Sequence, residues 1–250
     1  MDQFELEIYK ELQAWQRKME RPASNLSFQQ SVKGIQNRFN QMIPQRFQNL
    51  MTSSIRNMVQ ATLNGSQYTT KVPRIEAYTL YRRERLFDEA LNQYKKTAAV
   101  EGAGTGAGGI FLGLVDFPLL LSIKMKFLFQ GAAIYGHDIH DYRERLYLLY
   151  IFQLTYSSKA WQEKVYTRMK NWSTYVHTLP PRLDYTQEVD WEKLQIEYRD
   201  HLDLVKMLQM LPGVGAIVGA WANYHLLEQL GETARNSFRM RYFDKMPPLT

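Results

Sequence analysis

The chain has 250 residues, of which 45% are hydrophobic and 22% are charged. This composition excludes disordered and fibrous proteins, and a chain of this length can bury a core in one large domain or two small ones. Cysteine is absent, which excludes disulfide bonds, thiol chemistry and thiolate metal ligands and agrees with a reducing compartment.

The net charge of +6 is concentrated in residues 21–75, which contain no Asp or Glu and which we call the acid-free window. Its basic residues are Arg21, Lys33, Arg38, Arg46, Arg56, Lys71 and Arg74. The helices predicted in this window are amphipathic, and such a surface suits anionic lipid headgroups. We therefore expect Lys33, Arg38, Arg46 and Arg56 to face lipid. A solvated face of a soluble bundle is the alternative, and nucleic acid is not expected as a partner because no motif supports it.

The first helix is predicted from apolar residues spaced by three and four, from Phe4 to Met19. This N-terminal stretch is acidic early and lacks the basic start and apolar run of a signal peptide. We therefore expect a cytoplasmic protein, peripheral to the inner face of the membrane.

Helical patterns continue along the rest of the chain. They are expected over 28–39, from Pro44 to about 64, over 75–101, from Pro118 to Gly136, over 142–158 and 160–177, from about 184 to 211, and over 213–243. No run shows sustained alternation with period two, so strands are not expected. The sequence predicts an all-α fold: a single multi-helix domain, with a basic amphipathic part at 1–70 and the main helical part at 71–250.

The sequence EGAGTGAGG at 101–109 is the first of two glycine-rich segments. Gly104, Gly106 and Gly109 match G-x-G-x-x-G, but a dinucleotide site needs a strand before this motif and an acid about 20 residues after it. A helical pattern precedes it here and lysines follow it, so no cofactor is expected. The alternative is steric, because small residues four apart create a flat face on which a second helix can approach closely.

The second glycine-rich segment, PGVGAIVGAWANY, repeats this spacing at 212–224. We expect the two segments to pack against each other as helices. The residues assigned to this packing are Gly102, Gly106, Gly109, Gly113, Gly215 and Gly219. Asp116, Lys124 and Lys126 lie in the middle of the apolar stretch that includes the first segment, which argues against simple spanning of a membrane. The stretch around the second segment is free of Asp, Glu, Lys and Arg from Met207 to Leu227 but contains Pro212, Asn223 and His225, so it is a borderline case for spanning. A shallow membrane insertion and a tightly packed soluble core both stay open.

These motifs together resemble the EcsC family, a group of bacterial proteins named for a gene that accompanies an ABC-transporter pair. The resemblance is carried by EGAGTGAGG, DFPLLL, YGHD and LPGVGAIVGAWANY, in that order, and covers about residues 75–245. The family commonly has an aromatic residue where this chain has His137. The resemblance implies no established activity, but it suggests a link to membrane transport or secretion.

Two groups of polar residues are candidates for chemistry. His137, His140 and Asp141 would share one face of a helix at metal-ligand spacing, although a ligand from elsewhere would be needed. Glu101, Asp116 and Asn223 lie in small or apolar stretches, where each needs a polar partner. Helix capping and buried hydrogen bonds are the simplest explanation for these three residues. The alternative is a catalytic site that they form between the glycine-rich segments.

The function expected from the sequence is that of a non-catalytic, membrane-associated accessory protein with an anionic membrane surface, and a membrane transporter, as partners. An enzyme with a buried carboxylate and histidine site is one alternative, and a soluble helical binding module is another. The sequence does not define an oligomeric state.

Overall fold

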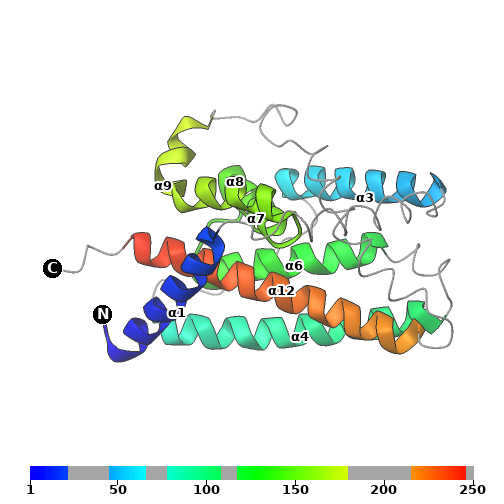
Figure 1. The fold of residues 1–250 in the computed structure, drawn as a ribbon, viewed down its shortest axis with the longest axis horizontal. Helices are drawn as coiled ribbons and strands as arrows, with labels where there is room; N and C mark the ends of the chain where they lie inside the picture. Colours follow the sequence, from blue (N-terminus) through cyan, green and yellow to red (C-terminus); the bar gives the residue numbers. More distant parts are fainter. Residues whose placement is uncertain (22–44, 66–77, 108–116, 180–214, 246–250) are drawn as a thin grey trace.

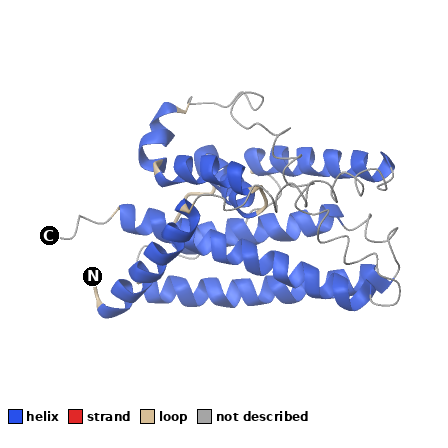
Figure 2. Cartoon of the chain, viewed as in Figure 1, coloured by secondary structure: helices blue, strands red, loops and turns tan. Residues whose placement is uncertain are grey.

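The computed structural model describes residues 1–21, 45–65, 78–107, 117–179 and 215–245. Within these ranges the chain forms eight α-helices and one short 3-10 helix, and no strand (Figure 2). The predicted all-α fold is therefore confirmed. The helices expected over 28–39 and from about 184 to 211 lie outside the described residues, as do Lys33, Arg38, Gly109, Gly113 and Asp116.

The centre of the fold is an antiparallel pair of long helices, α4 (Leu80–Ala107) and α12 (Gly215–Asp244) (Figure 1). Three ion pairs fix their register: Glu84 with Arg239, Asp88 with Arg235, and Lys95 with Glu228. Each step forward along α4 is matched by an equal step back along α12. The two helices therefore keep one register from Glu84 to Lys95 on α4 and from Glu228 to Arg239 on α12.

The apolar helix α6 (Phe117–Tyr135) packs on this pair and is buried over most of its surface. Pro118 lies in its first turn, as predicted, where a missing backbone N–H costs nothing. Gly131 allows a close contact, because a Cβ atom there would lie 2.9 Å from a ring carbon of Phe87 and 3.0 Å from one of Phe238. The helix thus meets α4 and α12 through an aromatic cluster.

The remaining helices surround this centre. They are α1 (Gln3–Glu20), α3 (Gln45–Asn64), α7 (Tyr142–Thr155), α8 (Lys159–Lys170), α9 (Trp172–Tyr175) and the 3-10 helix η1 (Val176–Thr178). Helix α1 begins with a capping box between Asp2 and Glu5 and buries Ile8, Leu12 and Trp15. Helix α3 ends at Gly65, whose φ of 70° suits glycine. Side chains of α1 and α3 join the same core cluster as those of α4, α6 and α12.

Candidate functional site

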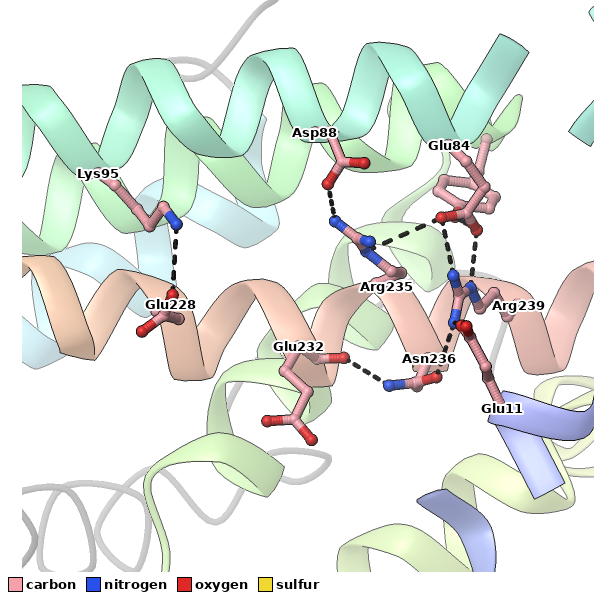
Figure 3. Close-up of polar contacts among 10 residues, drawn as sticks. Glu11, Glu84, Asp88, Lys95, Glu228, Glu232, Arg235, Asn236 and Arg239 are labelled. Atoms are coloured by element: carbon pink, nitrogen blue, oxygen red, sulfur yellow. Dashed lines mark hydrogen bonds and ion pairs between the residues drawn. The ribbon is translucent and has the colours of Figure 1, made fainter. Parts of the chain in front are cut away.

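A buried ion pair joins α4 and α12 (Figure 3). Arg239 donates from Nε to Glu84 Oε1 at 2.7 Å and from Nη2 to Glu84 Oε2 at 2.9 Å. Only 4% of Arg239 and 5% of Glu84 is exposed to solvent. The two-pronged geometry and the burial make this a strong polar link between α4 and α12.

Further groups complete a network around the pair. Tyr135 on α6 donates its hydroxyl to Glu84 Oε1 at 2.6 Å, and Arg239 Nη1 donates to Glu11 Oε2 on α1 at 3.1 Å. Burial would lower the pKa of Arg239, but the hydrogen bonds and charge of Glu84 raise it. Burial and the neighbouring Glu84 raise the pKa of Tyr135 well above its usual value. The network connects four helices, α1, α4, α6 and α12. Its donors and acceptors form hydrogen bonds with one another.

The turn between α6 and α7 gives a physical reason for the sequence YGHD. Gly136, with a φ of 82°, ends α6, and the N–H of His137 donates to Ala132 O at 3.0 Å. This is the Schellman arrangement that glycine favours. Asp138 Oδ1 then accepts from the N–H of His140 at 2.9 Å, and Asp141 caps α7 by accepting from Arg143 N. The carboxylates of Asp138 and Asp141 thus both stabilise the turn.

The prediction that His137, His140 and Asp141 share a helix face is wrong, because Gly136 ends the helix before them. His137 is buried and His140 is exposed, while Asp141 is bound by Arg143 at 2.6 Å, and this hydrogen bond lowers the pKa of Asp141. Across the five ranges that the structure describes, no group of three or more His, Asp or Glu residues could hold a metal ion.

His137 lies beside a second ion pair, between Glu144 on α7 and Arg241 on α12. Its Nδ1 is 3.5 Å from Glu144 Oε2, which alone would favour a charged imidazole. Arg241 already neutralises that carboxylate, however, through Nη2 to Oε1 at 2.7 Å and a second contact. Burial first, and then the charges of Arg241, Lys245 and Arg83, hold the pKa of His137 well below its ordinary value.

The structure separates the other candidate residues from this turn. Glu101 lies 17 residues along α4 from Glu84, which is about 25 Å for an α-helix. Asn223 lies 16 residues before Arg239 on α12, so the register brings Asn223 and Glu101 to the same level of the helix pair. A single site containing both Glu101 and His137 is therefore not formed. A pairing of Glu101 with Asn223 stays a prediction.

The described parts of the glycine-rich segments lie in the last turns of α4 and the first turns of α12. Gly102 is buried on α4, and Gly106, Gly215 and Gly219 have helical backbone. The close approach of the two segments stays a prediction, although the helices that carry them pack together. A close approach is seen further along, where a Cβ atom at Gly231 would lie 2.5 Å from Leu91 Cδ1.

Some polar residues of the fold carry no local sequence signal. Glu84, Arg235 and Arg239 lie in ordinary amphipathic patterns. The acids Glu84 and Asp88 are four residues apart on α4, as are Arg235 and Arg239 on α12, and only this matching spacing could suggest a pair of complementary helices. Lys124 is a charged residue in the apolar helix α6. It is fully buried, with Nζ 4.2 Å from the centre of the Tyr156 ring, and burial lowers its pKa.

The fold and the network define an all-helical protein organised on one antiparallel helix pair. Its sequence matches the profile of the EcsC protein family over residues 6–243, and the chain belongs to that family. It is 45% identical over 214 residues to "Protein EcsC" of Bacillus subtilis (strain 168), covering 86% of each chain. It is also 29% identical over 147 residues to "Uncharacterized protein YdbA" of the same organism, covering 58% of this chain and 52% of the relative. No solved structure matches the chain. The family match reaches further toward the N-terminus than the motifs alone indicated.

Proposed function

We propose that this EcsC family protein is a non-catalytic accessory protein that binds the anionic inner surface of a membrane, close to a transporter or secretion system. The proposal is supported most directly by the charge of the exposed face of α3, the described helix of the acid-free window. Met51, Ile55 and Met58 place one face of α3 in the core. Its exposed positions include Arg56 and the neutral residues Ser53, Asn57 and Gln60. Helix α3 therefore offers a basic or neutral surface without any carboxylate.

The exposed face of α4 differs from that of α3 in its charge. Exposed positions of α4 carry both signs, with Arg82 and Arg85 followed by Asp88 and Glu89. Carboxylates are repelled by anionic lipid, whereas each Lys or Arg near such a surface contributes about 1 kcal/mol of binding. The absence of acids over 55 consecutive positions, 21–75, favours the α3 side of the molecule for contact with lipid.

Apolar residues at one end of the bundle also support the proposal. Helix α4 ends, and α6 and α12 begin, at the same end (Figure 1). Val100, Leu119 and Trp221 lie in these terminal turns and are 74%, 44% and 54% exposed. Tryptophan is enriched where a protein meets the membrane interface. The ranges that the structure describes contain one helix, α6, that is apolar enough to span a membrane, but 72% of its most apolar window is buried, as in a core helix.

Vesicle flotation tests the proposal. We expect the protein to float with vesicles containing phosphatidylglycerol and to remain at the bottom with pure phosphatidylcholine or at high salt. The triple variant Lys33→Glu, Arg38→Glu, Arg56→Glu should lose most of this binding. A matched variant, Arg82→Glu, Arg85→Glu, Lys96→Glu, changes the net charge equally at exposed positions of α4 and should keep it. Equal loss in both variants, or binding that ignores lipid charge, would refute the proposal.

A further inference from the structure

A cleft of about 560 Å³ lies on a part of the molecule separate from α3. Its walls come from α1, the start of α7, the region from α8 to η1, and the end of α12. The volume is within the range of pockets that hold small molecules, about 300–1,000 Å³. The cleft is therefore large enough for a ligand of several non-hydrogen atoms.

The cleft combines apolar walls with cations. Leu12, Met169 and Phe243 line it, and so do the four cations Arg143, Lys170, Arg241 and Lys245, against the three carboxylates Asp141, Glu144 and Asp244. Arg143 and Arg241 bind Asp141 and Glu144, respectively, with two of the five N–H groups that each guanidinium offers. Lys170 binds Glu20 outside the cleft at 2.6 Å, and Lys245 has no ion-pair partner within the described ranges.

One donor in the cleft wall is left without an acceptor. Trp172 lines the cleft and is only 4% exposed, and its indole Nε1 has no hydrogen-bond partner among the described residues. A buried N–H without a partner costs about 1–3 kcal/mol, so such groups are rare in folded proteins. The nitrogen itself is covered by protein atoms, so an acceptor in the cleft would remove this cost once the Trp172 ring shifts to expose its N–H.

We propose that this cleft binds a small organic anion, made of a short apolar body and a carboxylate or phosphate group. The oxygens of the anion accept hydrogen bonds from the Trp172 indole and the free N–H groups of Arg143 and Arg241, while Lys245 adds its charge at the mouth. The apolar body packs on Leu12, Met169 and Phe243. This site is independent of the lipid surface proposed above, since it uses other helices.

Nuclear magnetic resonance of the indole groups tests the site, because the chain has five tryptophans. We expect hexyl phosphate and hexanoate to move the Trp172 signal in a saturable way, and hexanol to leave it in place. Trp172→Phe identifies the signal, and by removing one hydrogen bond to a charged group it should weaken calorimetric binding of hexyl phosphate about tenfold.

Lysine variants distinguish binding in the cleft from general electrostatic attraction of the anion to the protein surface. Lys245→Ala should weaken binding of hexyl phosphate about two- to fivefold, the value of an exposed charge, and Lys164→Ala, an exposed lysine outside the cleft, should not change it. Movement of the Trp172 signal by phosphatidylglycerol vesicles alone would assign the anion to a lipid headgroup. Equal effects of both lysine variants, or no saturable shift with any of these probes, would overturn the proposal.

Discussion

Arg239 near the end of α12 and Glu84 near the start of α4 form a two-pronged, buried ion pair, with N–O distances of 2.7 Å and 2.9 Å. The pair joins the two longest of the described helices and links α1 to them through Glu11. Burying two charges is costly, but removing one of them leaves the other buried and unpaired. The pair therefore makes the docking of the helices specific, and its loss should destabilise the whole fold.

We expect Glu84→Gln to lower the free energy of unfolding by about 3–5 kcal/mol, since the buried Arg239 would keep its charge with only the exposed carboxylate of Glu11 near it. Urea denaturation followed by circular dichroism measures this change. The variant pair Arg85→Ala and Glu89→Ala is the control, because these exposed residues form an ion pair one turn apart at 3.4 Å on the same helix. Removing that pair should cost less than about 1 kcal/mol. Equal losses in both experiments would contradict the role given to Glu84.

Gly131 should tolerate a methyl group poorly. The added carbon would lie 2.9–3.0 Å from rings of Phe87 and Phe238, which are fully buried and cannot turn away. We expect Gly131→Ala to destabilise the protein by about 1–3 kcal/mol, even though alanine favours a helix by about 1 kcal/mol. Gly231→Ala is the comparison, because there the obstacle is the flexible end of Leu91. If thermal unfolding ranks Gly231→Ala as the more damaging change, the packing argument for Gly131 fails.

His137 should make stability depend on pH. Its folded-state pKa is held below 6.5, the value expected in the unfolded chain, by burial and by the cations Arg241, Lys245 and Arg83. Below about pH 6.5 the unfolded state therefore binds more protons, and stability falls as the pH drops, by up to about 1.4 kcal/mol per pH unit.

The substitution His137→Phe should flatten this dependence between pH 7 and pH 5, while keeping the ring contact with Phe238 at 5.6 Å. Urea midpoints measured across that range check the prediction. His140 is exposed, so His140→Gln should leave the slope unchanged. A slope that survives in His137→Phe would mean that other groups are responsible.

Local patterns in the sequence predicted the helices well but not how they meet. The spacing from Phe4 to Met19 predicted α1, and Pro118 and the residues near Gly65 marked a helix start and a helix end that the structure confirms. Such features depend on neighbours a few residues apart. Glu84 and Arg239 are 155 residues apart, so no local pattern could pair them.

The errors have physical causes as well. The spacing of His137, His140 and Asp141 indicates a shared face only if the helix continues, and the left-handed backbone of Gly136 ends it. The sequence pattern of glycines four residues apart does not mark Gly131 or Gly231 as packing residues, because neither has another glycine four residues away. The candidates Asp116, Lys33 and Arg38 lie outside the described residues and stay predictions.

Helices α4 and α12 are expected to keep one register into both glycine-rich segments, and the packing of these segments depends on it. The chain has no cysteine, so spin labels can be attached at chosen positions without background. Continuing the pairing of Lys95 with Glu228 along the helices brings Thr105 level with Val218. The electron–electron distance between labels at Thr105 and Val218 is the most direct test. We predict that it is clearly shorter than the distance from Thr105 to Gln229, which lies eleven residues, or about 16 Å along the axis, further along α12. An equal or longer distance between Thr105 and Val218 would show that the helices diverge before the glycines meet.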